Sequence, residues 1–105
     1  MSTKEVTAYC LSKPNVMDGF PFRKETLVFK AGRKVFCLLR LDQDPPTINV
    51  KCHPEEAIEL RKKYAAITAG YHMDKKHWNT IALDGSLSDK QIKGFIDQSY
   101  ELVTN

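Results

Sequence analysis

Three stretches rich in β-branched and aromatic residues follow one another in the chain, with turn residues between them. They span residues 26–30, 35–41 and 47–52, and the links are Ala31-Gly32 and the proline-containing loop 42–46. Links this short join antiparallel neighbours, because parallel strands need a crossover of a dozen or more residues. The sequence therefore predicts an antiparallel meander that packs on one face.

Alternation within these strands predicts which side chains face the core. In 47–52, the apolar residues Ile48, Val50 and Cys52 alternate with polar ones and are expected to point inward. In 35–41, the wholly apolar face is Val35, Cys37, Leu39 and Leu41. The outward face is then a basic platform with one aromatic ring, made of Lys30, Lys34, Phe36, Arg40, Asn49 and Lys51. Sheet readers of nucleic acid have this character, and an ordinary solvated face is the alternative.

Capping and turn residues predict helices on both sides of the meander. Ser2 and Glu5 have the spacing of a capping box for a helix that ends near Ser12. Pro14 and the Asp18-Gly19 pair then predict a turn region up to residue 25. Pro54 is placed to begin a second helix that ends near residue 63 or 64.

The remaining segments predict an irregular stretch, a strand and a last helix. Residues 65–77 are expected to be irregular or partly extended, and 78–83 to be a strand. Ser88 caps the last helix, whose apolar stripe is Ile92, Phe95, Ile96, Tyr100 and Val103. The order α-β-β-β-α-β-α predicts a single α+β domain over residues 1–105, with a mainly antiparallel sheet and helices packed on one face.

Composition narrows the class of protein without indicating its function. The longest apolar run, 35–39, is far shorter than the roughly 20 residues of a membrane span. The first residues lack the basic and apolar regions of a signal peptide. Three cysteines without CxxC spacing favour reduced thiols in the cytoplasm, and their places on apolar stripes predict buried structural thiols. We expect no membrane contact.

Charge is unevenly distributed along the chain, whose net charge is +3. Residues 23–41 hold six basic residues and one acidic residue, and residues 51–78 hold six basic and four acidic residues with all three histidines. Binding of nucleic acid would require these two basic segments to lie next to each other in the folded domain. Within the second segment, the basic residues Arg61, Lys62 and Lys63 end a predicted helix that begins with two glutamates. These three side chains either contact phosphates or complement the helix dipole.

The densest candidate site is YHMDKKHWNT at residues 71–80. Its lysines suit phosphate, and Tyr71 and Trp78 suit stacking on bases, although both aromatics are alternatively core anchors of the last strand. His72 and His77 lie five apart, which is not the i, i+4 pair of a helical zinc motif, so we expect no metal. With no nucleophile, phosphate-loop or dinucleotide motif either, we expect no cofactor and no enzyme activity.

This segment resembles the MmcQ/YjbR family, as do LVFK at 27–30, LRLDQDPP at 39–46 and NVKC at 49–52. GFPF at 19–22, DGSL at 84–87 and SYEL at 99–102 extend the resemblance over nearly the whole chain. The resemblance implies a CyaY-like (frataxin-like) double-wing fold and DNA binding, and it points to Lys51, Tyr71, His72, Lys75, His77, Trp78 and Asn79. The frataxin likeness suggests iron binding, which this sequence opposes because Glu5 is the only carboxylate of the first helix.

The leading hypothesis is a monomeric, non-catalytic DNA-binding domain. Phosphates would be contacted by Lys51, Lys75 and Lys76 together with Arg61, Lys62 and Lys63, and the surface would be shaped by Tyr71, His72, His77 and Trp78. The alternative is an adaptor for a protein or small ligand, with a pocket around residues 71–78. A third interpretation makes the HWNT segment entirely structural.

Overall fold

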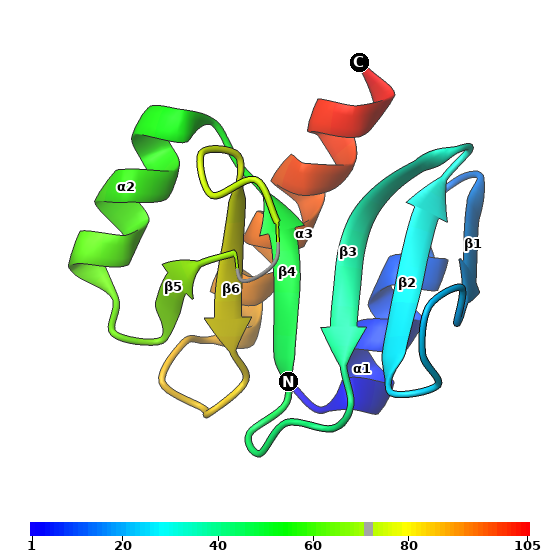
Figure 1. Ribbon diagram of the computed structural model, residues 1–105, viewed down its shortest axis with the longest axis horizontal. Coiled ribbons are helices and arrows are strands. Elements are labelled where there is room, and N and C mark those ends of the chain that lie inside the picture. The colour runs from blue at the N-terminus through cyan, green and yellow to red at the C-terminus, as the bar shows by residue number, and fades with distance from the viewer. Residues whose placement is uncertain (71–72) are drawn as a thin grey trace.

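The computed structural model describes residues 1–70 and 73–105, and this part contains three α-helices and six β-strands. In chain order these are α1 (Thr3–Leu11), β1 (Val16–Gly19), β2 (Thr26–Ala31), β3 (Lys34–Arg40), β4 (Thr47–Lys51), α2 (Pro54–Lys63), β5 (Ile67–Ala69), β6 (Trp78–Ala82) and α3 (Asp89–Thr104). The strands form one sheet in the order β1-β2-β3-β4-β6-β5, and every neighbouring pair is antiparallel (Figure 1). The predicted α+β class and the meander of β2, β3 and β4 are confirmed.

The helix ends follow the predicted caps. Ser2 and Glu5 form a complete capping box at α1, with the Ser2 hydroxyl accepting from the Glu5 N–H at 3.1 Å and the Glu5 carboxylate accepting from the Ser2 N–H at 2.9 Å. Ser88 and Gln91 form the same arrangement at α3. α2 begins at Pro54 without a side-chain cap and ends in its three basic residues. These caps satisfy amide groups that the first turn leaves free.

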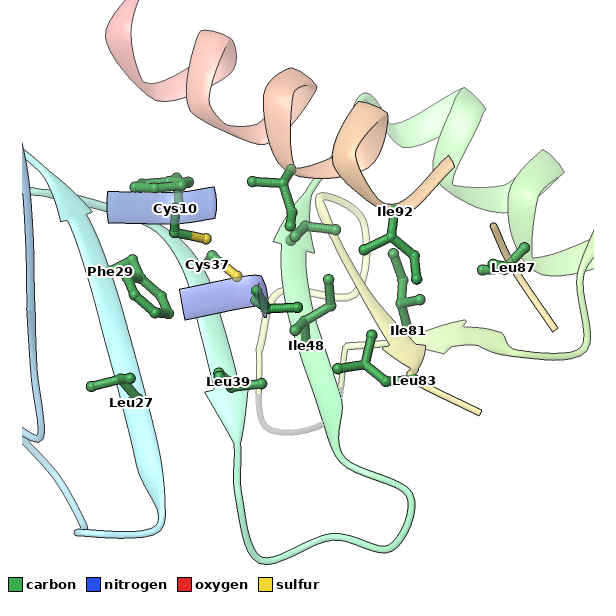
Figure 2. Packing of buried hydrophobic residues seen from close by; sticks show 14 of the residues in the cluster. Cys10, Leu27, Phe29, Cys37, Leu39, Ile48, Ile81, Leu83, Leu87 and Ile92 are labelled. Atoms are coloured by element: carbon green, nitrogen blue, oxygen red, sulfur yellow. The ribbon is translucent and has the colours of Figure 1, made fainter. Parts of the chain in front are cut away.

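The helices pack on one face of the sheet, where the core lies. α3 lies against β3 and β4, α1 lies beside it near β1, and α2 contacts β5 and β6 (Figure 1). Figure 2 shows Phe29, Cys37, Ile48 and Ile81 of four strands pointing to this side, with Cys10 of α1 near Cys37 and Ile92 of α3 next to Ile81. Among the described residues no helix covers the other side, which we call the open face.

A β-bulge changes the predicted alternation in β3. Phe29 pairs with Cys37 but Lys30 pairs with Val35, so Phe36 is the extra residue of β3. Phe36 is fully buried in the core, where its ring lies edge-on to Tyr100 of α3 with centroids 5.3 Å apart. The predicted outward position of Phe36 and inward position of Val35 are therefore wrong, because the bulge shifts the pattern by one residue. The predicted inward position of Leu41 is also wrong, since β3 ends at Arg40 and Leu41 is exposed.

Two short strands were not predicted as such. β1 forms within the segment predicted as a turn region, and β5 forms within the segment predicted to be irregular or partly extended. Both are edge strands that pair with one neighbour each, β1 with β2 and β5 with β6. Their sequences, VMDG and ITA, are too short to show alternation, so pairing rather than local pattern defines them.

The cysteines agree with the expectation from composition. All three cysteines are free and buried, as predicted. A hydrogen bond with Cys10 and burial raise the pKa of Cys37, and burial and Glu56 raise the pKa of Cys52 to about 11. These two thiols are therefore protonated at neutral pH.

In the described ranges, no helix combines the length and the apolar character needed to cross a membrane.

A charged network joins α1 to α3. Tyr9 donates a hydrogen bond to Asp97 Oδ1 at 2.6 Å, and the Lys13 ammonium contacts the same oxygen at 2.6 Å. Burial by itself raises the pKa of Asp97, but the hydrogen bonds from Lys13 and Tyr9 outweigh it and hold that pKa below its usual value. The bond to Asp97 raises the pKa of Tyr9 to about 12. This network fixes the two helices side by side on the sheet.

The bulge predicts a reversal of the expected mutational costs in β3. Phe36→Ala should lower the free energy of unfolding by about 3–5 kcal/mol, since it empties a fully buried aromatic site. Val35→Ala, the control, should cost about 1 kcal/mol or less, because Val35 is only partly buried and lies outside the core. Urea denaturation of both variants measures the difference. A larger cost at Val35 would show that simple alternation holds and the bulge is absent.

The Asp97 network predicts a pH-dependent contribution to stability. Asp97→Asn should cost about 1 kcal/mol at neutral pH, since a charge-assisted bond at a partly exposed carboxylate is screened by water. Because the pKa of Asp97 is depressed in the folded chain, the contribution is complete above the unfolded-state pKa of about 4 and is lost as the pH falls through the folded-state pKa.

Urea titrations of wild type and Asp97→Asn should therefore show a constant difference at neutral pH that closes below about pH 4. Tyr9→Phe is the control, because it removes one hydrogen bond and keeps the ion pair with Lys13. A difference that stays constant down to about pH 3 would contradict the role of the ionised carboxylate.

Candidate functional site

The open face of the sheet carries basic charge and no acidic residue in its strands. Its residues, which alternate with the core positions, are Met17, Gly19, Thr26, Val28, Lys30, Val35, Leu38, Arg40, Thr47, Asn49, Lys51, Thr68, Trp78, Thr80 and Ala82. Three of these are basic. The helices on the other side carry seven of the thirteen acidic residues of the chain. The same helices carry six basic residues, so their net charge is −1, whereas the strand residues of the open face are basic without any acidic residue.

Lys51 and Trp78 form one cross-strand row of this face. They are register partners in β4 and β6, and the N–H of Cys52, the residue after β4, donates to the His77 carbonyl at 2.7 Å. Trp78 is partly exposed, so its indole is not sealed in the core. Gly70 lets the chain pass against it, since a Cβ on Gly70 would lie 2.8 Å from the Trp78 Cβ. A lysine and a tryptophan thus occupy adjacent positions on the open face at the end of the sheet.

A tight turn before β6 projects Lys75 and Lys76 into solvent. The Asp74 carboxylate accepts a bond from the Lys76 N–H at 2.9 Å and a bond from the His77 ring, and the Trp78 N–H donates to the Asp74 carbonyl at 3.0 Å. The hydrogen bond from His77, with that from the Lys76 N–H, lowers the pKa of Asp74. The carboxylate is thus used inside the turn, and the side chains of Lys75 and Lys76, which follow Asp74 in the chain, are exposed.

The structure brings some of the predicted residues together and separates others. Arg61 reaches the turn, with its guanidinium donating to the Lys75 carbonyl at 3.2 Å. Lys62 instead lies 3.7 Å from Glu59, and Lys63 lies over the Tyr64 ring at 5.3 Å. Both belong to the last turn of α2, as the dipole interpretation expects. Tyr71 and His72, which were also predicted to shape this surface, lie outside the described residues.

Three of the lysines near Trp78 have no acidic partner among the described residues. Within residues 1–70 and 73–105, Lys51, Lys75 and Lys76 have no carboxylate oxygen within 4.0 Å. Together with Arg61, His77 and Trp78 they form what we call the β4–β6 cluster. Unpaired ammonium groups attract an anionic polymer, because binding releases its condensed counterions.

Asn79 has a structural position rather than one on this surface. It alternates to the helix side of β6, is 2% exposed and donates to the Ala57 carbonyl of α2 at 3.3 Å. Its amide thereby holds α2 to the sheet. Of the positions singled out by the family resemblance, this one is therefore explained by packing.

Sequence reasoning missed a groove on the open face and the aromatic loop above it. The groove has a volume of about 590 Å³ and is lined by Phe22, Arg23, Thr26, Leu38, Arg40, Asn49 and Met73. Phe20 and Phe22 are 50% and 73% exposed in the loop between β1 and β2. The sequence did contain a signal for this loop, namely two phenylalanines on either side of a proline. Only the folded structure shows that Phe22 and Arg40 line the same groove. Among the described residues, no three potential metal ligands cluster.

Comparison with known proteins places this chain in a family. The YjbR family model matches residues 11–102. The protein YjbR of Escherichia coli (strain K12) is 30% identical over 105 residues, which cover 100% of this chain and 89% of that protein.

Two crystal structures share the fold. A Deinococcus radiodurans protein with a DUF419 domain matches with a TM-score of 0.94 and 36% identity, over 99% of this chain and 79% of that one. A Pseudomonas syringae protein matches with a TM-score of 0.85 and 30% identity, over 97% of this chain and 98% of that one. The match to the family model and the likeness over the full length of the fold establish that this chain belongs to the YjbR family.

Proposed function

We propose that this chain is a monomeric cytoplasmic domain that binds DNA on the open face of its sheet and performs no catalysis. The proposal is carried by the register pairing of Lys51 with the partly exposed Trp78, since Lys51 has no acidic partner among the described residues. Lysine neutralises phosphate, and an indole stacks on bases. These two chemistries at one place are what a nucleic-acid surface needs.

The surroundings of this pair support the same function. Lys75 and Lys76 extend from the turn that leads into Trp78, and Arg61 is bound to that turn. Arg40 and Lys30 continue the basic charge across the open face, where the strands hold no acid. The proposed contacts are thus Lys51, Arg61, Lys75 and Lys76 to phosphates, with Trp78 and His77 beside them, and they exclude Lys62 and Lys63.

The alternative function is an adaptor that binds a protein or a small ligand near residues 71–78. The observed groove is lined by Met73 and lies over β2, β3 and β4. An uncharged ligand there would bind with little dependence on salt, whereas DNA binding loses affinity steeply as salt rises. Salt dependence therefore separates the two functions.

Lys75→Ala/Lys76→Ala should weaken DNA binding and flatten its salt dependence. Each phosphate contact contributes a slope of about −0.9 for duplex and about −0.7 for single strands in log K against log salt, so losing two should reduce the slope by about 1.8 or 1.4. Fluorescence anisotropy with a 12-nucleotide single strand and its duplex, over a salt series, measures the affinity and its salt dependence.

The matched control is Lys4→Ala/Lys90→Ala, which removes the same charge from exposed positions at the starts of α1 and α3. It should leave the salt slope unchanged, because these lysines lie on the helix side. Equal losses in both double variants would show that net charge alone drives binding. No binding of either form by the wild type at low salt would end the proposal.

Trp78→Ala should separate a binding role from a structural one. We expect binding of the single strand to weaken about tenfold, since one base stack contributes about 1–3 kcal/mol. The stability cost should stay near 1–2 kcal/mol, below the 3–5 kcal/mol of a fully buried aromatic, because the indole is partly exposed.

Trp78→Phe is the control and should retain most of the affinity, because it keeps an aromatic face. Urea denaturation and anisotropy are measured on the same samples. A full 3–5 kcal/mol loss of stability in Trp78→Ala, with unchanged affinity of the folded fraction, would instead support the interpretation of HWNT as structural.

A further inference from the structure

The groove on the open face joins the β4–β6 cluster directly. Asn49 and Thr80 are register partners, and they lie two residues along β4 and β6 from the Lys51–Trp78 row. Two residues along a strand span about 7 Å. A smaller depression of about 230 Å³, which shares Arg40 and Asn49 with the groove, is lined by Arg40, Gln43, Thr47, Asn49 and Thr80. One continuous surface therefore runs from the exposed lysines to the groove.

The floor of the groove offers unused polar groups held in fixed positions. Asn49 is 5% exposed and donates its amide N–H to the Thr80 hydroxyl at 2.7 Å, and that hydroxyl donates to the Ala69 carbonyl at 3.2 Å. Among residues 1–70 and 73–105, no group donates a hydrogen bond to the Asn49 Oδ1. The Arg40 Nε is buried, and the acceptor recorded near it in the described part of the chain is an Asp42 carboxylate oxygen at 3.4 Å. A buried polar group without an aligned hydrogen bond is costly unless a ligand or water supplies one.

Apolar side chains also line the groove, and its charge is partly neutralised. Leu38 and Met73 line it, and the Phe22 ring at its edge is 73% exposed. The Nε of Arg40 lies 3.4 Å from an Asp42 carboxylate oxygen, which offsets part of the Arg40 charge. A phosphate is thus better placed on the unpaired Lys51 than on Arg40. The floor instead suits the polar edge of a neutral planar group, with apolar contact on its faces.

These features match one chemical class, an unpaired nucleobase. A base has donors and acceptors around its edge and apolar faces that stack on aromatic rings. A volume of about 590 Å³ lies within the usual range for small-ligand sites and admits one such group. Inside a duplex that edge is paired and the faces are stacked, so a recessed site accepts only a base that is single-stranded or flipped out.

We infer that the groove between Phe22, Arg40 and Asn49 binds one unpaired base, while Lys51 and the lysines of the turn hold the adjoining phosphates. This inference rests on the proposed function, and it adds that the domain selects single-stranded over duplex DNA. Phe22 provides the stacking face, and Arg40 and Asn49 provide the hydrogen bonds to the base edge.

The test compares two phenylalanines of one loop. Phe22→Ala removes a ring that lines the groove, and Phe20→Ala removes a ring that lines a neighbouring depression with Met17 and Val28. Both are exposed, so both variants should fold. With a mixed-sequence 12-nucleotide single strand, Phe22→Ala and Arg40→Gln should each weaken binding about tenfold, and Phe20→Ala should change it less than twofold. Duplex binding should be weaker than single-strand binding in the wild type and unaffected by Phe22→Ala.

The outcomes distinguish this inference from the proposed function. Wild-type binding of both DNA forms with equal affinity, or a Phe22→Ala variant that binds the single strand normally, would overturn the base site and leave DNA binding by the lysines intact. An equal effect of Phe20→Ala and Phe22→Ala would also overturn it, because the groove would then have no special role. No binding of either form to the wild type at low salt would overturn the proposed function, and the base site with it.

Discussion

The packing of all three helices on one face of the sheet is the constraint on which the rest depends. α3 supplies the central contact, since its Ile92 and Ile96 are buried against β3 and β4, and its Ser99 hydroxyl donates to the Phe36 carbonyl. That hydroxyl also accepts a bond from the Lys51 N–H at 2.8 Å. One serine of α3 is therefore attached to both central strands. Because the helices occupy this side, the polar and basic residues that alternate with the core positions are presented together on the open face.

Much of the fold follows from local sequence. The alternation of Ile48, Val50 and Cys52, the caps at Ser2 and Ser88 and the stripe of α3 each depend on residues close in the chain, and each is confirmed. The bulge at Phe36 depends on how β2 and β3 pair, which no pattern within one strand reveals. β1 and β5 are likewise defined by their pairing with β2 and β6 and not by a local sequence pattern. Errors therefore occurred where long-range pairing outweighs local preference.

The candidate site divides in the same way. The lysines near Trp78 are visible in one short segment, so sequence reasoning found them. The meeting of Lys51 with Trp78 requires the register of β4 and β6. The groove requires the loop after β1, the floor of β3 and β4 and Met73, which are far apart in the chain. The separation of Lys62 and Lys63 from the turn also requires the fold, because charge along the chain does not specify direction in space.

The central claim is that the open face, and not the helix side, contacts DNA. The most direct measurement is an NMR titration of ¹⁵N-labelled protein with a 12-nucleotide single strand. The account predicts shifts for the backbone amides of β3, β4 and β6 and for the side-chain amide of Asn49, with the amides of α1 and α3 unchanged. Shifts concentrated on α1 and α3, or spread evenly over the molecule, would contradict it.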